Sequence, residues 1–459
     1  MADTYLENTS QGTPTSTKIG TISVWAKNEY GSGGSIISNF SDSSNRIYFR
    51  FNNDGSLYTY GKLAGSGNVT MESIMLLRDP TAWYHLVLAY DTTQATDTNR
   101  MKYYVNGVQI TDWVTDTYLP QDAVVRFNGE DNLNIGRRYD GTHKDPFDGY
   151  MAEFIFIDGT QYAASDFGET DSTTGIWKPI LPPSVTYGNN GYRLEFAGTG
   201  ATADSSGFGA DTSGNDNHLT AVNLGTNPST VDTPSNNFCT LNPVDMGWDV
   251  ESLTVGGLYL TNGDTSGKSA EQHCCGTLAA KKGKWYWEMK NLANTAMIAI
   301  KATEDALTAS TSDATILMGE YNNGGEMRYR NASGYTDMTT GVDTFTAGDI
   351  IGCALDLDND RAYFHKNGTW QGDPTPDPAS ATTGSNNVPI PDDQFIAPMG
   401  CDNSSGSAGE SKFNFGNPIV TISSNGGDGY ADAAGYGKFE YQPPSGFYAL
   451  CTKNINTYG

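Results

Sequence analysis

The sequence has few basic residues, and this scarcity excludes several classes of function. It carries 27 Lys and Arg against 53 Asp and Glu over 459 residues, a formal net charge of −26. Such a surface repels phosphate backbones, so we expect no nucleic-acid partner. No apolar run approaches the roughly 18 residues of a membrane helix, so we expect no membrane insertion. The first residues lack the basic and apolar regions of a secretory signal peptide, which indicates a protein made in a cytoplasm.

Cysteine and histidine are also scarce, and they are not spaced for metal binding or catalysis. The six cysteines include no CxxC pair, and the neighbouring Cys274 and Cys275 cannot easily bond each other, so we expect mostly free thiols. The five histidines show no HxxxH spacing. His85 lies within an apolar run and is expected to be structural. No GxSxG motif, P-loop or recognisable Ser/His/Asp grouping occurs, so the sequence predicts a protein that is not an enzyme.

A retaining glycosidase would require two carboxylates about 5–5.5 Å apart. The nearest pair, Glu153 and Asp158, is five residues apart on one expected strand, which puts the two side chains on opposite faces. Asp356 and Asp358 alternate and could share a face, but they lie at an expected hairpin end, where acidic residues usually form turns. Glycosidase activity is therefore disfavoured.

Glycine, tyrosine and short alternating segments are abundant. There are 53 Gly and 26 Tyr residues. Segments such as 19–27, 46–51 and 56–60 are short and follow one another closely, with Gly, Asn and Asp turns between them. No long stretch has apolar residues at helical spacing with caps. The pattern predicts an all-β protein, and the length allows two or more domains with separate cores.

Three segments of the first half occur in an informative order. DPTAWYHLVLAY at 79–90 is a turn followed by an apolar strand, MKYYVNGVQI at 101–110 is a hairpin, and FDGYMAEFIFI at 147–157 is a turn followed by a strand. Together they resemble the concanavalin A-like, laminin G-like jelly roll. The loop DTSGNDNH at 211–218 resembles a turn of the same domains, so we expect a strand near 191–220 to close the first domain.

Two segments of the second half, GKWYWE at 283–288 and GDIIGCALDLDNDRAYFHKNG at 348–368, resemble the SPRY domain, a β-sandwich binding module. FNFG at 413–416 resembles the closing strand of such domains, and residues 372–391 form an insertion rich in Pro, Thr, Ser and Asn. The predicted fold is therefore all-β, with two tandem β-sandwich (jelly-roll) domains, laminin G-like and then SPRY-like.

Composition places the domain boundaries. We expect residues 1–18 to be a flexible polar arm, 19–225 the first sandwich, 226–245 a linker, and 246–459 the second sandwich with a C-terminal tail. The arm and the linker are rich in Ser, Thr, Asn or Pro, and neither contains a long alternating segment. The tail segment YQPPSGFYALC resembles one that follows such domains in phage proteins.

Candidate ligand residues lie in or beside expected loops, where rigid sandwiches usually carry recognition. Aromatic rings stack on sugars, and the candidates for binding carbohydrate or a receptor are Trp113, Tyr118, Tyr139 and Trp370. Calcium is the best cofactor candidate, because laminin G-like domains often hold one near such loops and hard cations take carboxylate and amide oxygens. Its candidate ligands are Asp148, Asp211, Asn215 and Asp216. A purely turn-forming role for these residues is the alternative.

The chain as a whole, two sandwiches followed by the PPSGF tail, is similar to structural proteins of marine tailed phages. The resemblance implies a virion protein, such as a non-enzymatic tail fibre or appendage adhesin that binds a host-envelope glycan or receptor. The N-terminal arm would then dock on other virion proteins, and the adhesin would be a homo-oligomer, for example a trimer. The alternatives are a decoration or filament subunit that mainly self-assembles and, least favoured, a depolymerase of envelope polysaccharide.

Overall fold

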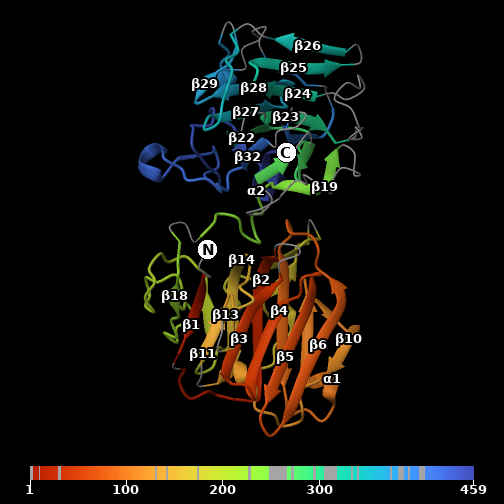
Figure 1. Ribbon diagram of the computed structural model, residues 1–459, viewed down its shortest axis with the longest axis vertical. Coiled ribbons are helices and arrows are strands. Elements are labelled where there is room, and N and C mark those ends of the chain that lie inside the picture. Colours follow the sequence, from red (N-terminus) through yellow and green to blue (C-terminus); the bar gives the residue numbers. More distant parts are fainter. Residues whose placement is uncertain are drawn as a thin grey trace. The chain divides into compact units, whose positions relative to one another are not determined.

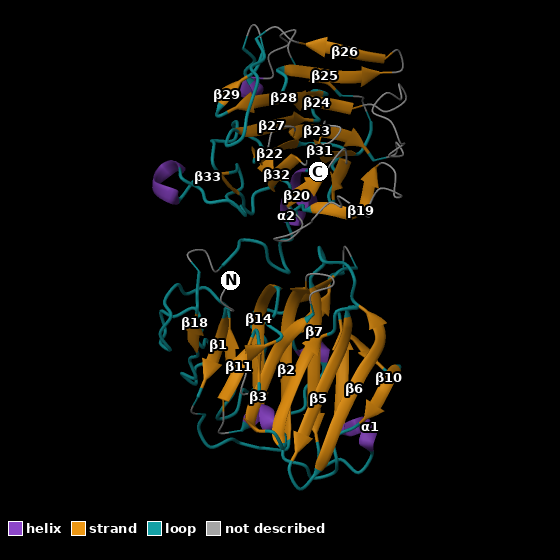
Figure 2. Cartoon of the chain, in the orientation of Figure 1, coloured by secondary structure: helices purple, strands orange, loops and turns teal. Residues whose placement is uncertain are grey.

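The protein is described here by a computed structural model that divides into two compact units. One consists of Met1–Ser229 and Thr233–Ser235, the other of Thr230–Asp232 and Asn236–Gly459, and each is described by itself. The structure describes residues 4–9, 11–28, 33–129, 132–140, 143–172, 175–225, 229–247, 266–269, 273–292, 296–303, 318–331, 334–338, 341–372, 375–380, 387–390, 393–402 and 409–459. Figures 1 and 2 show that each unit consists mainly of strands with few helices.

The first unit has an eight-stranded and a six-stranded sheet, both antiparallel. The large sheet consists, in spatial order, of β10 (Trp113–Thr117), β6 (Gly67–Leu76), β5 (Ser56–Leu63), β4 (Asn45–Phe51), β3 (Gly34–Asp42), β11 (Asn132–Ile135), β1 (Tyr5–Asn8) and β18 (Thr220–Val222). The small sheet consists of β17 (Tyr192–Leu194), β14 (Gly149–Asp158), β2 (Ile19–Asn28), β7 (Tyr84–Asp91), β8 (Met101–Val105) and β9 (Val108–Ile110). Short elements outside the two sheets are α1 (Asp97–Arg100), β12 (Arg138–Tyr139), β13 (His143–Lys144), β15 (Gly168–Thr170) and β16 (Trp177–Pro179).

Buried and partly exposed side chains alternate along the strands, and this explains how the first unit forms its core. In β4, Ile47, Phe49 and Phe51 point inward and are at most 1% exposed, while the residues between them are only partly buried. The turn from β4 to β5 contains Gly55 at φ 85°, a left-handed conformation that glycine adopts without strain. Apolar side chains of the large and small sheets meet in one cluster, which stabilises the sandwich.

The N-terminal segment differs from the flexible arm expected over residues 1–18. Tyr5–Asn8 form β1, which pairs with β11 on one side and β18 on the other, and Leu6 is 3% exposed. The expectation was wrong because a four-residue strand has too little pattern to recognise, and its two neighbours lie far along the chain. The described part of this segment is therefore built into the sandwich, so the expected docking arm has no free strand there.

The second unit also has two layers. Its seven-stranded sheet consists of β19 (Leu241–Gly247), β21 (His273–Gly276), β31 (Ile396–Asp402), β23 (Ala296–Ala302), β24 (Met318–Asn322), β25 (Glu326–Asn331) and β26 (Gly334–Met338). Its eight-stranded sheet consists of β20 (Ser266–Ser269), β32 (Gly409–Asn414), β22 (Lys284–Asn291), β27 (Ile350–Asp356), β28 (Arg361–Lys366) and β29 (Thr369–Trp370), with β30 (Val388–Pro389) on β28 and β35 (Tyr448–Ala449) on β22. Short elements are β33 (Tyr430–Ala431), β34 (Lys438–Phe439) and α2 (Thr452–Tyr458).

The segment GKWYWE forms the start of β22 at the centre of the second unit. Trp285 and Trp287 are fully buried in the core between the sheets, and Tyr286 is fully buried on the other face, in a cluster with residues of the C-terminal segment. The segment 348–368 forms the antiparallel hairpin β27–β28. At its tip, the Asp356 carboxylate accepts bonds from the backbone amides of Asp358 and Asn359, as expected for a turn former.

Two expected segments of the second half differ from the structure or lie partly outside it. The end of the linker expected at 226–245 belongs to the second unit, because Phe238 and Cys239 are each 1% exposed in its cores and β19 begins at Leu241. The insertion at 372–391 lies partly outside the described residues. No helix in the described part of the chain is long and apolar enough to span a membrane.

Candidate functional site

The outward side chains of β3 to β6 in the first unit form a grid on the solvent face of the large sheet, which we call the outer face. Register pairing places them in three rows: Phe40, Arg46, Lys62 and Asn68; Ser38, Tyr48, Tyr60 and Thr70; Arg50, Tyr58 and Glu72. The ring of Tyr48 lies 5.6 Å from that of Tyr60 and 6.2 Å from that of Tyr58, measured between centroids. The three tyrosines are half-buried and so form a continuous aromatic surface.

The hairpin β12–β13 crosses the outer face beside Tyr48. The Ser38 hydroxyl donates to the Arg137 carbonyl at 2.9 Å and accepts from the Tyr139 amide at 3.3 Å. Arg138 lies 4.9 Å from the centre of the Tyr48 ring and forms an ion pair with Asp145 at 3.0 Å. These contacts hold the hairpin against the sheet, next to the tyrosines.

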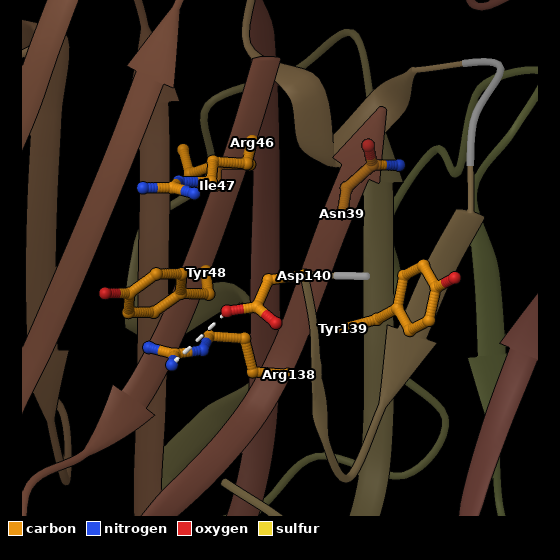
Figure 3. A pocket seen from close by; sticks show the side chains of 7 residues that line it. All are labelled: Asn39, Arg46, Ile47, Tyr48, Arg138, Tyr139 and Asp140. Carbon is orange, nitrogen blue, oxygen red and sulfur yellow. Dashed lines mark ion pairs between the residues drawn. The ribbon is translucent and has the colours of Figure 1, made fainter. Parts of the chain in front are cut away.

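A hollow of about 80 Å³ lies between the β12–β13 hairpin and the sheet. We call it the outer hollow, and it is lined by Asn39, Arg46, Ile47, Tyr48, Arg138, Tyr139 and Asp140. Figure 3 shows the rings of Tyr48 and Tyr139 on opposite sides of the Asp140 carboxylate, which pairs with Arg138 at 3.6 Å. Sites that enclose a drug-sized ligand measure about 300–1,000 Å³, so only one substituent of a larger ligand fits in the hollow.

The outer face can both stack on a ligand and hydrogen-bond to it. Burial raises the pKa of the Tyr48 hydroxyl, while Arg138 and Arg50 act in the opposite direction. Burial also raises the pKa of Tyr58. Both hydroxyls therefore stay protonated at neutral pH and remain hydrogen-bond donors. Flat ring faces beside amide, carboxylate and guanidinium groups suit the alternating apolar and hydroxyl surfaces of a sugar.

The structure brings only Tyr139 of the four expected aromatic ligands to the outer hollow. Trp113 and Tyr118 are half-buried and pack against the core of the first unit, with the Trp113 ring 4.9 Å from that of Tyr103. Trp370 lies on β29 in the second unit, and its ring meets that of His365 edge to face at 5.0 Å. These three side chains pack against residues of their own unit's core.

Sequence reasoning missed Arg46, Tyr48, Tyr58 and Tyr60. A usable signal exists, because the outward positions of NRIYFRF and SLYTYGKL hold Arg, Tyr and Lys where a solvated strand face often holds Ser, Thr or Asn. The signal does not show that the two strands are neighbours in this register, or that a hairpin about 90 residues later in the chain covers part of them.

The expected calcium ligands do not form one site. Asp211, Asn215 and Asp216 share the loop at 211–218. Asp211 forms a bridge with Leu194, which pairs with Phe154 of β14. Asp148 lies just before the first residue of β14, six residues before Phe154. At about 3.3 Å per strand residue, Asp148 therefore lies roughly 20 Å along the strand direction from the position that Asp211 occupies.

The carboxylate of Asp211 is already saturated with donors. Its Oδ1 accepts from the amides of Arg193 and Ser213 at 2.9 and 2.8 Å, and its Oδ2 accepts from the Ser213 hydroxyl and the Asn217 amide, both at 2.9 Å. The Asn215 side-chain amide donates to two backbone carbonyls, and Asp216 is 90% exposed. Within the described ranges, no group of three or more His, Cys, Asp or Glu side chains is placed to hold a metal. These residues form a turn, and they do not fit a calcium ion.

We expect Asp211→Ala to lower the unfolding free energy of the first unit by about 2–4 kcal/mol, because four donors around a buried carboxylate lose their acceptor. We expect EDTA to leave the melting temperature unchanged. Thermal unfolding of the wild type with EDTA or excess calcium, and of the variant, measures both effects. A fall in melting temperature with EDTA that added calcium reverses would show instead that the loop binds the ion.

The two carboxylates closest to a glycosidase pattern are both held by protein donors. Glu153 lies at a bulge in β14 with φ 49°, and its Oε2 accepts from Arg193 Nε at 2.9 Å. Burial raises the pKa of Glu153, and Arg193 partly offsets this. Asp158 is 2% exposed, and its oxygens accept four hydrogen bonds. Neither carboxylate is placed to attack a substrate or to protonate one.

His85 has the protonation pattern of a structural histidine. Its Nδ1 accepts from Trp177 Nε1 at 3.0 Å, so Nε2 carries the proton and donates to Ser23 Oγ at 2.9 Å. A general base for Ser23 would have to accept at Nε2. Burial lowers the pKa of His85 to about 3, so the ring stays neutral. The pair therefore does not support nucleophilic catalysis.

A protein-family model matches most of the first unit. Residues 2–176 match the model of the concanavalin A-like lectin/glucanases superfamily, and the search of curated proteins found no significant match. One similar solved structure is the SPRY domain of human HERC1, with 15% sequence identity and a TM-score of 0.27 over 38% of this chain and 96% of that chain. A second is the TRIM65 PSpry domain, with 10% identity and a TM-score of 0.26 over 38% of this chain and 91% of that chain. A third is the native heptameric SAP-like pentraxin of Limulus polyphemus, with 15% identity and a TM-score of 0.25 over 35% of this chain and 78% of that chain. The sheets of the two units confirm the predicted all-β fold with two tandem sandwiches.

Proposed function

We propose that the chain is a non-enzymatic glycan-binding protein and that it binds through the outer face of the first unit. The observation that carries this proposal is the aromatic surface of Tyr48, Tyr58 and Tyr60 beside the outer hollow. The rings stack on the apolar faces of sugar residues, and the polar lining of the hollow fixes the orientation of one substituent. The match of residues 2–176 to a superfamily that includes lectins supports the proposal.

We place this activity on the surface of a virus particle, as a tail fibre or appendage adhesin that binds a host-envelope glycan or receptor. The support is the sequence resemblance to tailed-phage structural proteins, carried by the order of the two sandwiches and the PPSGF tail. A homo-oligomer, for example a trimer, would strengthen binding through several weak sites acting together. Labelling of intact particles by an antibody against this chain tests the location, and an absence of label on the particle surface contradicts it.

Replacing Tyr48 with alanine tests the binding surface. We expect about tenfold weaker glycan binding, equivalent to about 1.4 kcal/mol, because the ring at the centre of the aromatic surface is lost. The measurement is binding to an array of immobilised bacterial envelope polysaccharides. Tyr436→Ala is the matched control, since Tyr436 is 41% exposed in the second unit. Unchanged binding by a folded Tyr48→Ala protein, or an equal loss in the control, contradicts the proposal.

A second candidate function, a self-assembling structural subunit, is favoured by one edge of the large sheet. On the edge strand β10, Val114 is 65% exposed, and the adjacent β6 exposes Ile74 at 56% and Met75 at 43%. An edge strand with exposed apolar side chains is a template for pairing with another chain. Under this candidate, Val114→Lys converts an oligomer into smaller species in light scattering, whereas the control Val231→Lys does not. An unchanged mass for Val114→Lys excludes this edge as the contact.

A further inference from the structure

Two cations lie directly opposite each other on the outer face. Arg46 of β4 and Lys62 of β5 are register partners in an antiparallel pair, so their side chains share one face and one row. Like charges in this position repel each other. In the part of the chain that the structure describes, no carboxylate lies within ion-pairing distance of either side chain. The pair is therefore uncompensated in a protein whose net charge is −26.

The neighbouring arginines differ from Arg46. Arg138 is neutralised by Asp145 at 3.0 Å and by Asp140 at 3.6 Å, and Arg50 pairs with the same Asp145 at 2.9 Å. Arg46 instead lies over the Tyr60 ring, 5.7 Å from its centre, and its Nε is buried without a hydrogen-bond partner. A buried donor without a partner destabilises the protein. Arg46 thus carries a positive charge on the outer face that no described carboxylate neutralises, beside the outer hollow that it helps to line.

We propose that the outer face binds an anionic substituent of the glycan, a carboxylate or a sulfate ester, beside the outer hollow, and that Arg46 and Lys62 hold it. This inference rests on the proposed function, because Tyr48 and Tyr60 are taken to contact the adjoining sugar ring. A guanidinium donates two parallel hydrogen bonds to a carboxylate or sulfate, and the ammonium adds a point charge. At 0.15 M salt, charges beyond about 8 Å are largely screened, so the local cations outweigh the distant acidic surface.

The test uses the full chain labelled with ¹⁵N-arginine and follows the Nε–H signals by NMR. The probes are sodium glucuronate, sodium methyl sulfate and glucose, at constant ionic strength set with sodium chloride. The Arg46 signal is assigned by its loss in Arg46→Gln, and the Nε–H of the exposed Arg78 is the internal control. We expect a saturable shift of the Arg46 signal with an anionic probe and none with glucose. Lys62→Gln should weaken the apparent affinity three- to tenfold, whereas Arg78→Gln should not.

The outcomes separate this inference from the proposed function. A response to glucuronate alone identifies a carboxylate site, and a response to methyl sulfate alone identifies a sulfate site. An Arg46 signal that responds to neither anion, or equally to glucose, overturns the inference, while polysaccharide binding on the array that depends on Tyr48 would still support a neutral glycan. A saturable anion response without binding to any arrayed polysaccharide overturns the glycan proposal and this inference with it.

Discussion

An Asp158→Ala variant is expected to lose at least about 4 kcal/mol of unfolding free energy in the first unit. The Asp158 carboxylate, at the end of β14, accepts from the amides of Thr15, Ser16 and Asn190 and from the side-chain amide of Asn128 at 2.6–3.0 Å. Each buried donor left without an acceptor costs about 1–3 kcal/mol, although such costs are not fully additive. The carboxylate joins three distant segments of the chain, so its removal loosens them together.

Differential scanning calorimetry measures this effect, and hydrogen exchange on β2 and β14 assigns the transition to the first unit. A loss of 4 kcal/mol corresponds to a fall in melting temperature of roughly 8–16 °C for a domain of this size. Asp216→Asn is the matched control, because its side chain is 90% exposed and Asn tolerates the positive φ of 58°, and it should shift the transition by less than about 2 °C. An Asp158→Ala transition as close to wild type as this control contradicts the structural role.

A comparably large effect is expected at Glu288 in the second unit, as a change of stability with pH. Glu288 is 2% exposed, and burial raises the pKa of its carboxyl to about 7. It accepts from the amides of Glu440 and Tyr441 at 2.9 and 2.8 Å, from the Tyr286 hydroxyl at 3.0 Å and from the Asn414 side chain at 3.4 Å. These bonds tie the C-terminal segment to the centre of β22.

The sign of the effect follows from the raised pKa. Between about pH 4.5 and 7 the folded chain holds a proton on Glu288 that the unfolded chain has released. The contribution of this proton to the unfolding free energy is therefore fully present below pH 4.5 and is lost as pH rises to 7. A shift from 4.5 to about 7 corresponds to about 3 kcal/mol. His365 acts in the opposite direction, because burial lowers its pKa to about 3 and its contribution is lost as pH falls below 6.5.

Comparison with Glu288→Gln isolates this carboxyl from the histidines. The unfolding free energy of the wild type relative to Glu288→Gln should fall by about 3 kcal/mol between pH 4.5 and 7.5. Chemical denaturation at a series of pH values measures the difference. Parallel profiles for wild type and Glu288→Gln would show that Glu288 does not keep a raised pKa in the folded protein.

The sequence predicted those parts of the fold that have strong local patterns. The segments that form β22, β27 and β28 carry the resemblance to SPRY domains that predicts a second sandwich, and the Asp and Asn cluster marks the turn between β27 and β28. Tyr5–Asn8 carry no such pattern, and they form a strand only because β11 and β18, which are distant in sequence, offer hydrogen bonds on both sides.

The candidate site was less predictable, because it depends on register and on a crossing hairpin. The sequence predicts Tyr139 as a loop aromatic, but Tyr48, which lines the same hollow, lies in a strand, where aromatic residues are common and often belong to the core. The same reasoning predicts Trp113 as a ligand, yet its ring packs on Tyr103. Asp211 has the composition of a calcium loop, and only the hydrogen-bond geometry shows that its oxygens are already used.

The most direct test of the central claim is NMR mapping of tyrosine ring signals while a polysaccharide that binds on the array is added. Assignments come from single Tyr→Phe variants, and the protein is the full chain. Glycan binding at the outer face predicts saturable shifts for Tyr48, Tyr58, Tyr60 and Tyr139, with Tyr436 of the second unit unchanged. Shifts confined to tyrosines of the second unit, or unchanged signals from the outer face at saturating polysaccharide, would contradict the claim.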